Sequence, residues 1–497
     1  MTRLIPEQSL AWKALGLLVI SFAVYQNLWV IDARGFFMAD DWGTLHAAQF
    51  RSWDRLYNFT LLPRTFYLDR PVGIAVIKIA YDLFGINYSA FGFVWLLLHL
   101  LNCYLIFLFT RNYLSRTGAF AASILSGVWF SANTALGWFA AINDIICATF
   151  CLATLVLHQS AIRRRSAFLF ILQIAAQILA IRSKEIALGL VIPVFLTGIL
   201  LEKLKIREAL RFNVSNILLT MVYTVQYLSV RLNESFNSDG SVYSLHLSPT
   251  LVITNTLKYT RMLLFVDRYF NIPVGDINIY FDKWYITFAV MIACFIALLV
   301  TTFRERWNIL IFATVTYLVT MGPLLLLKSQ FSELYLYTPH FFFAIICCIG
   351  IGCSKRMSRT LSYLLVVMII VLQSYGSFRI KQSKIHFERT EVCHEQFDIA
   401  TCLLRGSDNR TTVVVSGVEP YFNPFEYGSG YSMQVALRDP TIKVLTGQHR
   451  EEMQEKYCQQ PSPRRYLDFL PRQSGSVQAI DKTGAVEEWC QTRRGND

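Results

Sequence analysis

Long apolar runs recur along the chain from Trp12 to Phe378 and then stop. A helix needs about 20 apolar residues to cross about 30 Å of hydrocarbon, so runs of this kind are typical of membrane spans. Hydrophobic residues make up 54% of the chain and charged residues only 16%, which is more apolar surface than a soluble core uses. The pattern predicts a mainly α, polytopic transmembrane helix bundle over residues 1–378 and a soluble domain over residues 379–497.

We predict about eleven spans, each an apolar run bounded by polar or charged residues. In chain order they are Trp12–Ile31, Ala90–Thr110, Gly118–Ser131, Ile145–His158, Ser166–Ile181, Ile186–Leu201, Val214–Leu228, Tyr285–Val300, Ile309–Leu327, Thr338–Cys353 and Leu361–Ser377. One further apolar stretch, Leu251–Val266, carries Asn255, Lys258 and Arg261 at helical spacing, which we expect to form one polar face. We therefore interpret that stretch as re-entrant or interfacial.

The net charge of +12 lies entirely before residue 379, because the last 119 residues hold 16 basic and 16 acidic side chains. Cytoplasmic loops of membrane proteins are enriched in Lys and Arg. Under the predicted topology, the inside loops hold 16 basic against 4 acidic residues. The charge therefore indicates membrane orientation rather than nucleic-acid binding, and it places the C-terminal domain outside.

The C-terminal part alternates strand-like and helix-like runs, which predicts a small α/β domain. The strand-like runs are Thr411–Ser416, Ile442–Leu445 and Ser476–Ile480, and the helix-like runs are Tyr431–Leu437 and Glu451–Tyr457. Its four cysteines are Cys393, Cys402, Cys458 and Cys490. An even number in an oxidising compartment permits two disulfides, with the pairing open.

Asp40 and Asp41 follow the first predicted span closely. Adjacent carboxylates beside an apolar surface are unfavourable, because like charges and desolvation both oppose ionisation. They suit a general base, with the neighbour orienting it or holding a divalent metal. The alternative is a helix N-cap for Trp42–Arg51.

Basic groups gather on the same outside face. Arg70 could bind a phosphate or carboxylate through two N–H groups, or lie at the membrane interface ahead of Pro71. Lys184 and Glu185 form either a local ion pair or a phosphate site. Arg261, with Lys258, is typical of contact with lipid head groups.

Further polar residues stand at the outside ends of spans. Asp144 precedes the span Ile145–His158, where a helix cap is the simpler interpretation. Glu333, Tyr337 and His340 mark the start of another span, where the tyrosine suits the aromatic belt of a membrane protein. His99 and Asn102 lie inside a span and favour interhelical hydrogen bonds.

In this order, these clusters resemble the GT-C glycosyltransferases, and within them the protein O-mannosyltransferase-like branch. The likeness covers about Trp12 to Phe378. Its pieces are the acidic pair, Arg70-Pro71, Tyr81-Asp82-Leu83-Phe84-Gly85-Ile86-Asn87, His99-Leu100-Leu101-Asn102, Asp144, Lys184-Glu185 and the block from Glu333 to Pro339. The family has Arg where this chain has Leu334, and the C-terminal domain matches none of the family's domains.

The resemblance implies a polyprenyl-phosphate-linked sugar as donor and a hydroxyl of a glycan, lipid or protein as acceptor, with transfer outside and inversion. It assigns Asp40 as base, Asp41 as orienting group or metal ligand, and Arg70, Lys184 and Arg261 as ligands of the donor phosphate. Asp144, Glu185, Glu333, Tyr337 and His340 would line the substrate pocket. No cofactor is implied beyond a divalent metal, which stays open.

Two other functions fit the same residues. A lipid-linked sugar transporter or flippase would need polar groups through the middle of the membrane or inverted repeats, and the sequence shows neither. A GT-C ligase would transfer a whole glycan with the same acidic pair and cations. We expect a bacterial inner membrane with a periplasmic C-terminal domain, and the endoplasmic reticulum membrane is the alternative.

Overall fold

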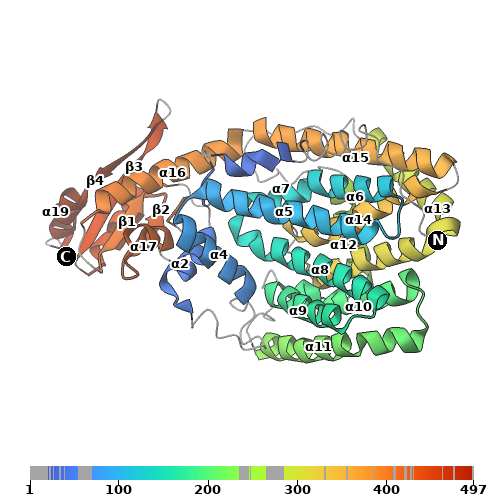
Figure 1. Ribbon diagram of the computed structural model, residues 1–497. Coiled ribbons are helices and arrows are strands. Elements are labelled where there is room, and N and C mark those ends of the chain that lie inside the picture. The colour runs from blue at the N-terminus through green and yellow to red at the C-terminus, as the bar shows by residue number, and fades with distance from the viewer. Residues whose placement is uncertain are drawn as a thin grey trace.

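The computed structural model describes the chain from residue 21 to residue 494, except for residues 54–69, 234–245, 265–284 and 329–331 and shorter gaps of one to four residues. Figure 1 shows a bundle of helices at one end of the molecule and a small sheet with its own helices at the other. This arrangement confirms the predicted fold class, a mainly α bundle with a small α/β domain.

Four described helical stretches are long and apolar enough to cross a membrane: Tyr88–Thr110, Phe139–Arg164, Leu334–Gly352 and Arg356–Ser374. Two shorter apolar stretches, Ala167–Ser183 and Glu185–Leu201, accompany them. The chain is therefore a multi-pass membrane protein, while the number eleven stays a prediction. Most of the first predicted span, Trp12–Ile31, lies outside the described residues.

The bundle consists of α5 (Tyr88–Thr110), α6 (Arg116–Val128), α7 (Phe130–Gly137), α8 (Ile142–Arg164), α9 (Ala167–Ser183), α10 (Val191–Leu196), α11 (Ile206–Asn233), α12 (Pro249–Leu264), α13 (Tyr285–Met321), α14 (Tyr337–Cys348) and α15 (Arg356–Gln382). Polar side chains set several of the helix starts. Asn87 accepts a hydrogen bond from the third residue of α5, and Ser115 and Ser166 do the same for α6 and α9.

The predicted span Tyr285–Val300 and most of the predicted span Ile309–Leu327 are joined in α13, which is broken at Arg306 (φ −135°, ψ 24°). The Arg306 guanidinium donates to the carbonyl oxygens of Gly352 at 2.9 Å and Tyr113 at 3.4 Å. These contacts hold the break against two neighbouring chain segments.

The prediction that Asn255, Lys258 and Arg261 share one polar face of α12 is wrong. Asn255 is buried and donates to the carbonyl oxygens of Leu325 and Leu327, at 3.0 and 2.9 Å, whereas Lys258 and Arg261 are exposed. Each residue turns the helix by about 100°, so a separation of six residues places two side chains about 120° apart. Asn255 therefore holds α12 onto the chain that follows α13.

The C-terminal sheet has the strand order β2-β1-β3-β4. Its strands are β1 (Thr412–Ser416), β2 (Lys443–Gly447), β3 (Arg464–Gln473) and β4 (Ser476–Asp481). The central strand β1 is buried throughout and pairs in parallel with β2 and β3, while β3 and β4 are antiparallel. Parallel neighbours need crossovers, which α17 (Tyr431–Leu437) and α18 (Arg450–Cys458) supply, and α19 (Thr483–Arg494) follows β4.

The five predicted runs of this domain are confirmed, but β3 was missed, because it begins with two arginines and contains a proline. A disulfide joins Cys458 to Cys490 and so links α18 to α19. Cys393 and Cys402 are not bonded to each other. Both lie on α16 (Lys384–Leu404), nine residues or about 13 Å apart along the axis, which exceeds the reach of a disulfide.

Two short helices, α2 (Asp41–Phe50) and α4 (Pro71–Phe84), lie between the bundle and the sheet (Figure 1). Lys78 of α4 donates to the Ala48 carbonyl at 2.7 Å and so holds the two together. Aromatic rings join α2 to the C-terminal region: Trp42 stacks on Phe397 of α16 at 5.0 Å, and His46 stacks on Tyr431 at 4.1 Å. Figure 1 also shows α16 continuing from α15 toward the sheet.

Candidate functional site

A cavity of about 990 Å³ opens where α2, α4, the start of α8 and α17 meet. Half of the predicted site residues line it, namely Asp40, Arg70, Asp144, Lys184 and Glu185. They come from segments separated by up to 145 positions in the sequence. The fold thus brings one acidic group and two acid–base pairs to the same space.

The neighbouring carboxylates Asp40 and Asp41 point to different partners. Asp40 lines the cavity, and its Oδ1 accepts a hydrogen bond from Trp138 Nε1 at 2.6 Å. Asp41 is buried, and its Oδ1 accepts from the backbone N–H of Ala140 at 2.7 Å. Asp40 precedes α2 but makes no side-chain capping bond. The N-cap interpretation of Asp40 is therefore wrong for the side chain, which is directed at Trp138 instead.

Burial raises the pKa of Asp40, because a carboxylate loses solvation near apolar groups, and the Trp138 hydrogen bond partly offsets the rise. A base works best when its pKa approaches the working pH while it is still ionised. The environment of Asp40 shifts the group in that direction. Asp41 is tied to the turn before α8, which fits a positioning role for that residue.

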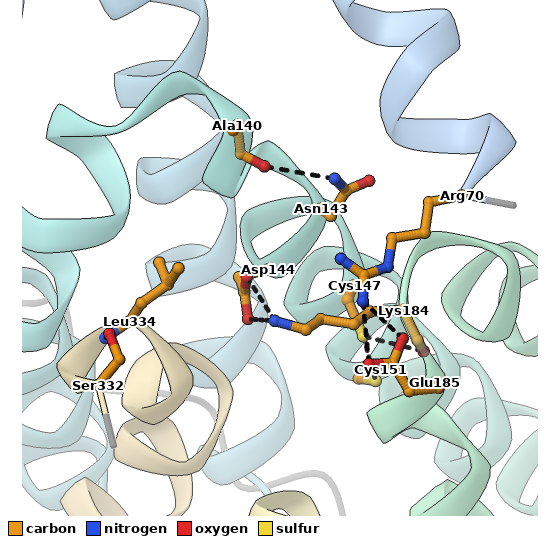
Figure 2. Close-up of polar contacts among 10 residues, drawn as sticks. All are labelled: Arg70, Ala140, Asn143, Asp144, Cys147, Cys151, Lys184, Glu185, Ser332 and Leu334. Atoms are coloured by element: carbon orange, nitrogen blue, oxygen red, sulfur yellow. Dashed lines mark hydrogen bonds and ion pairs between the residues drawn. The ribbon is translucent and has the colours of Figure 1, made fainter. Parts of the chain in front are cut away.

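Two ion pairs lie side by side on the wall of the cavity, as Figure 2 shows. Lys184 Nζ donates to both carboxylate oxygens of Asp144, at 2.6 and 2.7 Å, and both side chains are buried. Arg70 Nη2 donates to both oxygens of Glu185, at 3.0 and 2.9 Å, and about a fifth of each of these side chains is exposed. The predicted local pair Lys184–Glu185 is thus replaced by two pairs between different segments.

The two cations differ in the donors they retain. Lys184 gives its hydrogen bonds to Asp144, and its ammonium also lies 5.0 Å from the centre of the Tyr335 ring. Arg70 binds Glu185 through Nη2, while its buried Nε has no hydrogen-bond partner among the described residues. Although burial opposes the charge of Arg70, Glu185 raises the pKa of the guanidinium, which stays protonated. Arg70 is therefore the better equipped of the two to receive an anion.

Other predicted site residues lie elsewhere. Tyr337 and His340 are buried in α14 and are not among the residues that line the cavity. Tyr337 Oη contacts His99 Nδ1 at 2.9 Å and accepts from Asn102 Nδ2 at 3.1 Å, as expected of interhelical hydrogen bonding. Arg261 is exposed on α12, away from the cavity lining. The Glu333 side chain lies outside the described residues.

No three His, Cys, Asp or Glu side chains gather closely enough to hold a metal ion within the part of the chain that the structure describes. Asp41, the candidate metal ligand, uses one carboxylate oxygen to accept the Ala140 N–H. The described geometry around the acidic pair is that of a hydrogen-bonded turn.

Several residues that line the cavity were not found by sequence reasoning: Trp138, Arg51, His46 and Tyr431. Trp138 had a detectable signal, since a tryptophan beside the outside end of a predicted span stands near the polar residues there. Arg51 and Tyr431 had none, because nothing in the local sequence brings α2 against α17.

No protein-family model matches the sequence, and no curated protein matches it. Solved structures with a similar fold include ArnT from Cupriavidus metallidurans in the apo state and bound to undecaprenyl phosphate, each with a TM-score of 0.52 and 11% identity over 96% of this chain and 99% of that chain. The Archaeoglobus fulgidus oligosaccharyltransferase in the apo form has a TM-score of 0.50 and 12% identity, over 90% of this chain and 66% of that chain.

At these identities the similarity establishes the fold. The chain has the GT-C fold that the sequence predicted, and the match to ArnT extends over the C-terminal domain, because it covers nearly the whole of both chains. The assignment to the O-mannosyltransferase-like branch stays a prediction.

Proposed function

We propose that this chain is a membrane glycosyltransferase. It moves a sugar from a polyprenyl-phosphate donor to a hydroxyl acceptor, with inversion, on the periplasmic or luminal face of the membrane. The observation that carries the proposal is the joint lining of one cavity by a half-buried carboxylate, Asp40, and a guanidinium, Arg70, whose Nε has no hydrogen-bond partner among the described residues. Undecaprenyl phosphate, bound by the ArnT structure of similar fold, belongs to the proposed class of lipid carrier.

The reaction needs a base and a group that stabilises the leaving phosphate. Asp40 removes the proton of the acceptor hydroxyl as its oxygen attacks the anomeric carbon, and the bond from that carbon to the phosphate oxygen breaks on the opposite side. Attack from the face opposite the leaving group inverts the anomeric centre. Arg70 binds the phosphate, whose negative charge grows as it departs.

Residues in and next to the cavity wall have supporting roles in this scheme. Asp41 fixes the turn that presents Trp138, and Trp138 in turn directs the Asp40 carboxylate. Lys184 neutralises Asp144, so the cavity wall carries no uncompensated buried carboxylate at that point.

The lipid part of the donor can bind along α11. Thr224, Tyr227 and Leu228 of α11 line the cavity, and Leu228 is more than half exposed. Other apolar side chains of α11, including Met221 and Val225, are likewise exposed. A helix with apolar residues open to the surroundings suits contact with lipid, so a polyprenyl chain would lie against α11 while its phosphate reaches Arg70.

Purified protein in nanodiscs is the test. We would incubate it with a panel of polyprenyl-phosphate monosaccharides and acceptor hydroxyls and follow release of polyprenyl phosphate by mass spectrometry. We expect turnover by wild type and by Asp398→Asn, an exposed control on α16. Asp40→Asn should lose about 100-fold or more, because a positioned base contributes about that much.

Full activity of folded Asp40→Asn would exclude Asp40 as the base. Transfer of a whole glycan in place of one sugar would identify the ligase alternative. Movement of the lipid-linked sugar across vesicles without any transfer would favour the flippase. We place the protein in a bacterial inner membrane with the C-terminal domain in the periplasm, and the endoplasmic reticulum remains the alternative.

A further inference from the structure

One face of α2 forms a strip of the cavity wall. Asp40, Gly43, Thr44, Ala47 and Arg51 line the cavity at spacings of three, one, three and four residues, which place them along a single side of a helix. The opposite side, including Trp42, Leu45 and Ala48, is buried in the core. The wall is therefore rigid, and the side chains between its two ends are small.

The strip begins at the proposed base and ends at a cation. Asp40 and Arg51 are eleven residues apart, or about 16.5 Å along the helix axis, since each residue advances the helix by about 1.5 Å. That separation exceeds the span of one sugar ring. Arg51 thus lies too far from Asp40 to act on the reacting atoms. It is placed instead to bind a part of the same molecule that lies further along the groove.

Ion pairing distinguishes Arg51 from the other two cations of the cavity, Arg70 and Lys184. Arg70 and Lys184 are each bonded to a carboxylate, whereas Arg51 forms no ion pair with any residue that the structure describes. A lone guanidinium at one end of an open groove is suited to a carboxylate or phosphate of a ligand.

The C-terminal domain also contributes to the cavity wall beside α2. Gly428 and Tyr431 line the cavity, and the Tyr431 ring is stacked on His46 at 4.1 Å. Burial lowers the pKa of His46, as does the nearby Arg51 to a smaller extent, so the imidazole is neutral at pH 7 and adds no second positive charge. Aromatic rings beside polar tips provide a flat surface of the kind that sugar rings contact.

We propose that this strip of α2, together with Tyr431 of the C-terminal domain, is the acceptor groove, and that it takes an acidic oligosaccharide whose anionic group binds Arg51. The inference rests on the proposed function, because it assigns the acceptor end of the same cavity. It gives the C-terminal domain a direct part in acceptor binding. Small side chains along the strip and the aromatic pair of His46 and Tyr431 beside it favour an extended glycan over a peptide, which would need backbone partners along its length.

The test measures binding without donor, so that it does not depend on turnover. Full-length protein in nanodiscs is titrated calorimetrically with oligogalacturonates of one to four units and with the same oligomers reduced at C6 to neutral galactose units. We expect wild type to bind the acidic trimer about tenfold more tightly than the neutral trimer, and the acidic monomer no better than the neutral one.

Three variants locate the effect. Arg51→Gln should remove the preference for acidic oligomers, and Ala47→Leu should weaken binding of both series by narrowing the groove. Arg405→Gln, which removes the same charge from an exposed position at the end of α16, should behave as wild type. Unchanged thermal unfolding would show that the variants are folded.

Equal affinity for acidic and neutral oligomers, or an acidic preference retained in Arg51→Gln, would overturn the proposal. Tighter binding of an oligoglutamate of similar length would overturn the assignment to a glycan. Absence of donor turnover by wild type in the nanodisc assay, with charge-dependent binding intact, would count against the proposed reaction and not against the groove.

Discussion

Two polar clusters lie close together in the bundle and use their hydrogen bonds differently. At the cavity, Arg70, Glu185, Lys184 and Asp144 are charged, and Arg70 keeps a donor without a described partner. Deeper in the bundle, the neutral groups of His99, Asn102 and Tyr337 bond to one another. Asn102 also donates to the carbonyl of Ile145, the residue next to Asp144.

The difference indicates which cluster can meet a ligand. His99, Asn102 and Tyr337 join α5 to α14, and none of them lines the cavity. A cluster that directs its bonds inward holds helices together. The charged cluster lines an opening and retains hydrogen-bonding capacity, so it can bind something that arrives from outside. Four substitutions separate these roles.

The largest effect should come from Lys184→Met. Asp144 would be left as a buried carboxylate without its ion pair, which typically costs about 3–5 kcal/mol. We expect a lower free energy of unfolding in detergent titrations. Replacing both partners, as Lys184→Met with Asp144→Leu, should restore much of the loss, because an apolar pair needs no compensation. No recovery in the double variant would show that the pair has a role beyond neutralisation.

Arg70→Gln should act on turnover rather than on folding. We expect a loss of about 100-fold in release of polyprenyl phosphate, because a charge that stabilises a leaving group has about this effect. Glu185→Gln is the matched control, since it breaks the same ion pair while leaving the guanidinium in place. Equal losses in both variants would mean that the pair matters only as structure.

Tyr337→Phe tests the neutral cluster. The change removes the partner of His99 and Asn102 in a buried setting, at a cost of about 1–2 kcal/mol in the free energy of unfolding. Turnover should stay within about threefold of wild type, because Tyr337 does not line the cavity. Lost turnover in a fully stable variant would instead place the hydroxyl in the reaction.

The smallest effect concerns pH. Asp40 must be ionised to act as a base, so activity should fall as the pH drops through its raised pKa. Trp138→Phe removes the donor that favours the carboxylate form. The acidic limb of the pH–rate profile should therefore move to higher pH, while the rate at alkaline pH stays within about threefold. An unmoved limb would assign that limb to another group.

Much of the bundle could be predicted because a bilayer demands long apolar helices, and their ends carry polar residues that the sequence displays directly. Asp40, Arg70, Asp144, Lys184 and Glu185 were found in this way, since each stands where an element begins or ends.

The sequence did not predict which side of each helix faces the cavity and which side faces the interior of the bundle. Tyr337 and His340 follow Tyr335, which lines the cavity, by two and five residues, but α14 buries both of them in the bundle. Tyr431 escaped for a different reason. It lies in another domain, and only the packing of α17 against α2 brings it to His46 and the cavity. Long-range packing of this kind leaves no local trace in one sequence.

The stack of Trp42 on Phe397 makes the segment around the acidic pair depend on the C-terminal region for its packing. The residue that follows the acidic pair rests on a ring supplied by the C-terminal region, and Phe36 makes a similar stack with His394 at 4.4 Å. A chimera that exchanges this region for that of a distant relative would need matching rings at both places. Without these rings α2 would lose its packing contacts with the C-terminal region. The segment around the acidic pair and the C-terminal region can therefore be inherited or engineered only together.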